Sequence, residues 1–139
     1  MTKAELLLEL REETYVSLKS SSVHGVGVFA ILYIPKGCQT IFSKRKVEWI
    51  KLSFEEVEQL PVHSRALIEI YYLYDNDGYF IPEFGCKIME MVSYLNHSNT
   101  PNIESDNDGE IFKALRDIKV GEELFIDYTK IAQGLNDYQ

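Results

Sequence analysis

Apolar and polar residues alternate in short runs along this chain, which predicts many brief strands and few helices. The first predicted element is a helix over residues 2–11, because the leucines at positions 6, 7 and 10 share one helical face. Thr2 and Glu5 have the spacing of a capping box at its start. From residue 14 onward, β-branched and aromatic residues form runs that serines and glycines interrupt. We therefore expect strands over residues 15–18, 26–31, 40–42 and 47–52.

The second half of the chain combines short helical segments with further strands. Ser53 and Glu56 form another capping-box pattern, so we expect a helix from there to Leu60. Residues 63–74 satisfy the helix and strand templates about equally, and we favour a helix for the first half of that segment. Polar turns at 75–78, 106–109 and 119–122 are followed by predicted strands at 79–81, 111–118 and 124–128.

The chain is predicted to form one domain, because no Pro- or Gly-rich linker divides its 139 residues. Hydrophobic residues make up 45% of the sequence and charged residues 26%, which is typical of a globular protein rather than a disordered one. We expect three parts: an N-terminal helix within residues 1–13, a β-rich body over 14–128 and a C-terminal tail over 129–139.

The net charge narrows the classes of partner. Fourteen Lys and Arg residues against 22 Asp and Glu residues give a formal charge of −8. This charge argues against direct binding to nucleic acid and suits a basic protein or peptide. The chain shows no signal-peptide pattern, and no apolar run approaches the ~20 residues of a membrane span. We therefore expect a cytoplasmic protein that binds no membrane.

Two kinds of metal site are not expected from the spacing of the candidate ligands. Cys38 and Cys86 are far apart and form no Cys-x-x-Cys pair, so neither a zinc knuckle nor a disulfide framework is predicted. The two Asp-Asn-Asp-Gly segments suggest calcium, but an EF-hand loop requires a glutamate six residues after its glycine. Phe84 and Leu115 occupy those positions, so we interpret both segments as hairpin turns.

Three segments could carry chemistry. The first is His-Gly-Val-Gly-Val-Phe at 24–29, whose glycines would let a ligand approach the backbone closely. The second, residues 93–102, follows an apolar stretch and is dense in hydrogen-bonding side chains, which are costly to bury unless each finds a partner. The third, residues 121–128, is a turn followed by a strand ending in Asp-Tyr. Taken singly, each also has a structural interpretation: a strand bulge, a self-capped turn and a hairpin arm.

Together, and in this order, the three segments resemble the SET-domain family of protein-lysine methyltransferases, over residues 15–128. The Asn-His-Ser triplet at 96–98 and Glu-Leu-x-x-Asp-Tyr at 123–128 carry most of the resemblance. It implies a mainly β fold with short helices, β-clip-like, made of several small sheets with a C-terminal pseudoknot. In that knot the segment at Asn96 and His97 would pass beside the strand that leads to Tyr128.

The resemblance also implies S-adenosylmethionine as cofactor and a lysine in a basic protein segment, such as a histone, as substrate. Tyr128 would be the catalytic tyrosine. The cofactor would contact His24, Gly25, Val26, Gly27, Asn96 and His97. Aromatic side chains attract an ammonium group, so the candidates for a substrate channel are Tyr71, Tyr72, Tyr74 and Tyr79, although ordinary packing explains each of them as well.

The chain departs from the family pattern in two places. Asn99 stands where many members have a zinc-binding cysteine, and no cysteine follows Tyr128, so the zinc cluster that closes the substrate channel is expected to be missing. The tail over 129–139 would then pack near the cofactor and substrate. Ser93-Tyr94 replaces the family's Arg-Phe and removes a positive charge. The alternative to an active methyltransferase is an inactive SET-like module that binds a protein partner. If the substrate is a chromatin protein, we expect a nuclear or host-delivered protein instead of a cytoplasmic one.

Overall fold

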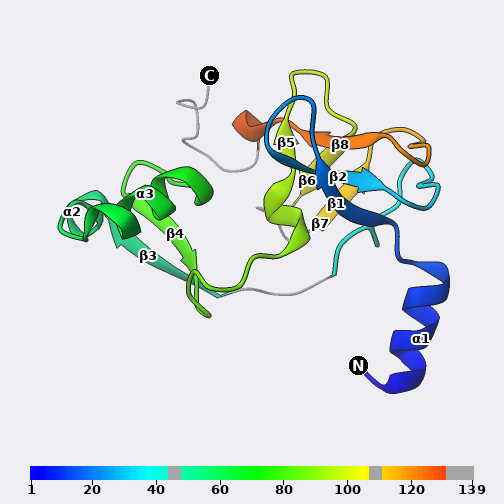
Figure 1. Cartoon of the computed structure of the whole chain (residues 1–139), viewed down its shortest axis with the longest axis horizontal. Helices are drawn as coiled ribbons and strands as arrows, with labels where there is room; N and C mark the ends of the chain where they lie inside the picture. Colours follow the sequence, from blue (N-terminus) through cyan, green and yellow to red (C-terminus); the bar gives the residue numbers. More distant parts are fainter. Residues whose placement is uncertain (44–47, 107–110, 131–139) are drawn as a thin grey trace.

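A computed structural model describes residues 1–43, 48–106 and 111–130 (Figure 1). Its larger lobe is built on a four-stranded sheet in the order β1-β2-β8-β5. β1 pairs antiparallel with β2 and β2 antiparallel with β8, whereas β5 runs parallel to β8. These strands are β1 (Val16–Ser20), β2 (Val26–Ala30), β5 (Asn96–His97) and β8 (Glu123–Ile126). The parallel pair confirms that the segment at 96–97 lies beside the strand leading to Tyr128.

The core of this lobe joins segments that are far apart in the sequence. Val28 and Leu124 face each other across β2 and β8 and are fully buried. Ile34 and Ile118 are equally buried and form an isolated antiparallel bridge. A small sheet of β6 (Ile103–Asp106) and β7 (Ile111–Ala114) adds Ile103 and Ala114 to the same cluster. Burial of these aliphatic side chains stabilises the crossing of the strands.

A second lobe is formed by the middle of the chain and lies at the left in Figure 1. It contains an antiparallel sheet of β3 (Trp49–Ser53) and β4 (Gly78–Pro82), with α2 (Phe54–Glu58) and α3 (Val62–Tyr71) between these strands in the sequence. A separate apolar cluster holds this lobe together, made of Val57, Ile68, Tyr72 and Ile81.

The helix starts agree with the sequence patterns. Thr2 and Glu5 form a complete capping box at α1 (Lys3–Glu12), and Ser53 and Glu56 form another at α2. The ambiguous segment after residue 62 is helical in α3 as far as Tyr71, further than predicted. None of the residues of α1 is buried, and the helix projects from the β-rich lobe in Figure 1.

Three strand predictions are wrong: one strand is absent and two are shorter than predicted. The strand predicted over 111–118 ends at Ala114. Residues 40–42 form no strand. Ile41 lies in an irregular segment and is buried, and the ring of Phe42 packs edge-on against Phe112 with the ring centroids 5.6 Å apart. Apolar side chains there fill the core without backbone pairing. The strand before Tyr128 ends at Ile126, and a 3-10 turn, η3 (Tyr128–Lys130), follows. Val47, most of the predicted turn at 106–109 and nearly all of the C-terminal tail lie outside the described residues.

Candidate functional site

Asn96 connects all three of the segments that the sequence analysis selected. Its side chain is only 5% exposed, at the start of β5. The Nδ2 group donates to the backbone carbonyls of His24 at 3.0 Å and Val26 at 3.4 Å, and to the Glu123 carboxylate at 2.8 Å. A buried amide needs such acceptors, so Asn96 holds the 24–27 loop against β5 and β8.

The two glycines of that loop serve different physical purposes. Gly25 has a φ of +47°, which a side chain disfavours, and the space where its Cβ would lie is open. At Gly27 a Cβ would overlap the Glu123 carboxylate and lie 3.1 Å from Asn96 Nδ2. The first glycine therefore shapes the exposed turn, and the second makes room for the side chains beneath it.

Glu123 is a site residue that the sequence analysis missed. One carboxylate oxygen accepts from Asn96, and the other accepts from the Ser21 hydroxyl at 2.7 Å. Ser21 Oγ in turn accepts from the backbone N–H groups of Val23 at 3.0 Å and His24 at 3.3 Å. The Glu-Leu-x-x-Asp-Tyr motif contained the available signal, but the pattern could not show which way this side chain points.

Asn102 fixes the strand that carries Glu123. It is 3% exposed, its Nδ2 donates to the Glu123 carbonyl at 2.9 Å, and its Oδ1 accepts from the Phe125 N–H at 2.7 Å. Both ends of its amide are therefore satisfied by β8. Asn102 belongs to the polar segment at 93–102. The high density of hydrogen-bonding groups in that segment is therefore explained in part by hydrogen bonds that hold β8 in place.

His97 holds the backbone at the third segment. Its Nδ1 accepts from the Tyr128 N–H at 3.0 Å, and its Nε2 lies 3.1 Å from Asn99 Oδ1. An acceptor at Nδ1 and a donor at Nε2 define the neutral tautomer with its proton on Nε2. The His97 and Tyr128 ring centroids lie 5.3 Å apart. The Asn-His pair thus contacts both other segments: Asn96 bonds to the 24–26 backbone and to Glu123, and His97 bonds to the Tyr128 backbone.

The Tyr128 hydroxyl is turned toward the backbone just before this pair, where it donates to the Leu95 carbonyl. Burial raises the pKa of Tyr128 above its usual range, so its hydroxyl stays protonated near neutral pH. This side chain can orient a partner through its oxygen and ring, but it is poorly suited to act as a phenolate base.

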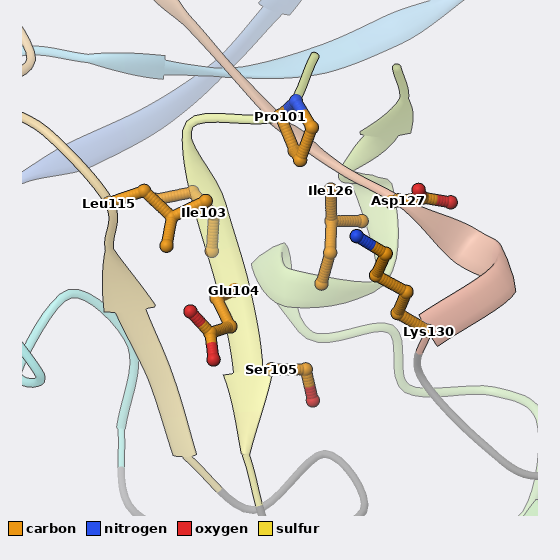
Figure 2. A pocket seen from close by; sticks show the side chains of 8 residues that line it. All are labelled: Pro101, Ile103, Glu104, Ser105, Leu115, Ile126, Asp127 and Lys130. Carbon is orange, nitrogen blue, oxygen red and sulfur yellow. The ribbon is translucent and has the colours of Figure 1, made fainter. Parts of the chain in front are cut away.

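A pocket of about 340 Å³ is lined by residues of β6, β8 and η3 and by neighbouring residues (Figure 2). Its apolar walls include Ile103, Leu115 and Ile126, and its charged groups are Glu104, Asp127 and Lys130. Ser105 also lines it, and the buried Oγ of this serine has no hydrogen-bond partner among the residues that the structure describes. Figure 2 shows Lys130 extending from η3 toward Ile126. Pro101 and Asp127 belong to two of the segments selected from the sequence, and Glu104 is one of the acidic residues expected to attract a basic substrate. The sequence did not predict that they line one pocket, because the pocket forms only where three separate segments meet.

The carboxylate of Asp127 is ionised near neutral pH. The Thr129 hydroxyl donates to Asp127 Oδ1 at 2.7 Å, and the Thr129 N–H donates to the same oxygen at 3.0 Å. The hydroxyl contact is the main reason why the pKa of Asp127 lies below its usual value. Asp127 therefore contributes negative charge where η3 begins.

The four tyrosines considered for a substrate channel lie in the second lobe. Tyr72 is buried in its core, and its hydroxyl lies 3.7 Å from Met89 Sδ. Tyr74 and Tyr79 pack against Phe54 with ring centroids at 6.0 Å and 5.5 Å. Tyr71 is 49% exposed at the end of α3. Packing accounts for three of them, and a channel role remains a prediction.

The described residues contain no group of three His, Cys, Asp or Glu side chains placed to hold a metal ion. The same part of the chain has no helix of the length and apolarity that crossing a bilayer requires.

Comparison with known proteins assigns the family. The SET-domain family model matches residues 25–129, so this chain belongs to the SET-domain family. The chain is 34% identical over 86 residues to the histone-lysine N-methyltransferase SET5 of Yarrowia lipolytica; the match covers 53% of this chain and 19% of that protein. A crystal structure of a Plasmodium falciparum protein, described as a candidate histone methyltransferase, superposes with a TM-score of 0.51 at 21% identity. It covers 84% of this chain and 94% of its own. That likeness confirms the predicted mainly β fold of several small sheets.

Proposed function

We propose that this protein is a protein-lysine N-methyltransferase that uses S-adenosylmethionine. The observation that carries the proposal is the meeting of three distant segments: Asn96 bonds to the 24–26 backbone, and its neighbour His97 bonds to the Tyr128 backbone. Membership of the SET-domain family and the likeness to a histone-lysine methyltransferase support it.

The residues around Asn96 suit a cationic cofactor. The 24–26 loop is exposed, and the open space at Gly25 leaves its backbone accessible to a ligand. The Leu95 carbonyl and the Tyr128 hydroxyl add oxygen atoms that would suit a positive sulfonium. We propose that His24, Gly25, Val26, Gly27, Asn96 and His97 hold the cofactor. When bound, S-adenosylmethionine supplies an electrophilic methyl group on a positive sulfonium.

The chemical part that we assign to Tyr128 follows from its protonation and its contact. The Tyr128 hydroxyl donates its proton to the Leu95 carbonyl, so its oxygen would face an amine or polarised C–H groups as an acceptor. A lysine amine must be neutral to attack. Burial next to a cation lowers the pKa of a lysine, so the site itself favours the neutral amine. Tyr128 then orients it for in-line displacement.

For the substrate end of the site we propose the pocket that Glu104, Ile126, Asp127 and Lys130 help to line. Its apolar walls suit the methylene chain of a lysine, while Glu104 and Asp127 attract the charged head and neighbouring basic residues. A basic protein or peptide, such as a histone tail, is therefore the substrate class that we expect, and Tyr71, Tyr72, Tyr74 and Tyr79 would shape the approach to it.

Radiolabelled methyl transfer tests the proposal. The protein is incubated with S-adenosylmethionine and with histones, basic ribosomal proteins or lysate, and calorimetry measures cofactor binding separately. We expect labelled lysine in at least one basic protein. Cofactor binding without transfer to any panel member would limit the proposal to the cofactor. No binding at millimolar cofactor would favour an inactive module that binds a partner.

The substrate pocket has its own test. Reversal of charge in Glu104→Lys is expected to raise KM for a basic peptide several-fold, more at low salt than at high salt, with kcat nearly unchanged. Glu83→Lys is the matched control, because Glu83 is exposed and lies outside the pocket lining. Equal effects of the two variants would argue against this pocket.

A further inference from the structure

The loop that would receive the cofactor is tied to the protein by one carboxylate. Glu123 accepts from Ser21 with one oxygen at 2.7 Å and from Asn96 with the other at 2.8 Å. Ser21 and Asn96 stand 75 positions apart in the sequence, on either side of the 24–27 loop. Glu123 bridges them from the start of β8.

Each of these donors acts on a different part of the loop. Ser21 Oγ accepts from the N–H groups of Val23 and His24, and the Ser21 N–H donates to the Gly25 carbonyl at 2.7 Å, which closes the turn. Asn96 binds the carbonyls of His24 and Val26. The carboxylate therefore fixes the donors, and the donors fix the backbone groups of the loop.

The packing at Gly27 supports the view that the position of the loop depends on the Glu123 carboxylate. The Glu123 carboxylate occupies the space that a Cβ of Gly27 would fill, so β2 and the carboxylate are in direct contact. No Lys, Arg or His of the described residues forms an ion pair with Glu123, and its partners are the neutral groups of Ser21 and Asn96. Hydrogen bonds to an ionised acceptor are stronger and more directional than neutral ones, which suits a positioning role.

We propose that Glu123, acting through Ser21, is a positioning residue. It holds the 24–27 loop, together with the turn that starts at Ser21, in the cofactor-binding conformation. The proposal rests on the proposed function, since it concerns the same cofactor. It assigns Glu123 and Ser21 no contact with the cofactor. Both S-adenosylmethionine and its demethylated product would bind to this loop, so loss of Glu123 or Ser21 should weaken the binding of both ligands alike. Because the two ligands differ in charge at sulfur, a purely electrostatic effect would instead act on them unequally.

The test compares Ser21→Ala with Ser21→Thr, which keeps the hydroxyl, and with Ser20→Ala, an exposed neighbour at the end of β1. Calorimetry measures the Kd of both ligands, and hydrogen exchange of the ligand-free protein follows the Val23 and His24 amides. We expect Ser21→Ala to raise both Kd values roughly tenfold and to speed exchange at those amides. Ser21→Thr and Ser20→Ala should resemble the wild type. Glu123→Gln should reproduce the alanine variant, because an amide cannot accept at both ends.

The results separate this proposal from the proposed function. If the wild type binds both ligands and Ser21→Ala binds them equally well, with unchanged exchange, the positioning role is wrong. A loss confined to S-adenosylmethionine would also overturn it, since that pattern indicates a charge effect instead of loop order. Failure of the wild type to bind either ligand would refute the proposed function, and the inference would fall with it.

Discussion

The backbone N–H of Tyr128 donates a hydrogen bond to Nδ1 of His97 across 3.0 Å. This contact joins residues 31 positions apart and places the third sequence motif against the second. It requires an acceptor at that ring position, so the neutral tautomer of His97 is part of the architecture of the site.

Replacement of His97 should therefore depend on where the new acceptor lies. The side-chain oxygen of Asn can occupy the place of Nδ1, whereas the longer Gln side chain places its polar end nearer Nε2. We expect His97→Asn to keep about 1 kcal/mol more unfolding free energy than His97→Gln, the size of one hydrogen bond. Urea denaturation of both variants measures the difference. Equal stabilities would show that the Nδ1 contact contributes nothing to folding.

Tyr128→Phe tests the hydroxyl. The variant loses the bond to the Leu95 carbonyl and the oxygen proposed to orient the amine, while its ring remains. We expect turnover to fall on the order of 10²-fold, or the number of methyl groups added to change, with cofactor Kd nearly unchanged. Tyr94→Phe, a half-buried tyrosine of η1 (Met91–Tyr94) beside the same core, is the control. Identical kinetics for Tyr128→Phe and wild type would remove the role of this hydroxyl.

Variants of two buried asparagines should distinguish an effect on folding from an effect on cofactor binding. Asn96→Ala and Asn102→Ala each leave backbone groups without their partners, which costs about 1–3 kcal/mol for each buried group. We expect both to lower the unfolding free energy. Only Asn96→Ala should weaken cofactor binding strongly, because Asn96 alone of the two contacts the 24–26 loop. Parallel losses of affinity in both variants would place the cofactor elsewhere.

Alkaline pH should destabilise the protein through its buried tyrosines. Burial raises the pKa of Tyr128 and of Tyr72 above the unfolded value of 10.0. The unfolded chain therefore releases these protons first, so the contribution of the two tyrosines to the unfolding free energy is constant below pH 10 and falls as pH rises beyond it. Thermal melts from pH 8 to 11 measure this loss, and it should be smaller in Tyr128→Phe. An unchanged melting temperature at pH 11 would contradict the burial of both hydroxyls.

Removal of α1 should leave the fold intact. The helix has no buried residue, and its leucines at positions 6, 7, 8 and 10 are 42–58% exposed. Deletion of residues 1–12 removes little apolar burial, so we expect a change in unfolding free energy below about 1 kcal/mol. Calorimetric melting of the shortened chain checks this. A large loss would mean that these leucines are covered in solution.

Local sequence determined the features that depend on neighbouring residues. Thr2 with Glu5, and Ser53 with Glu56, satisfy backbone groups within one turn, so both helix starts could be predicted. Asp75 likewise accepts from the Asp77 and Gly78 N–H groups and closes the predicted turn. The three motifs identified the family because their residue types and order are distinctive.

Tertiary structure decided what each motif residue does. Gly27 is small because of Glu123, which lies 96 positions later, and Ser21 is held by the same carboxylate. The segment at 40–42 has a strand-like composition but finds core contacts instead of a pairing strand. The pocket lined by Glu104, Asp127 and Lys130 forms where β6, β8 and η3 meet. Side-chain patterns report local periodicity and residue type, whereas these contacts depend on how distant segments cross, which short-range spacing does not encode.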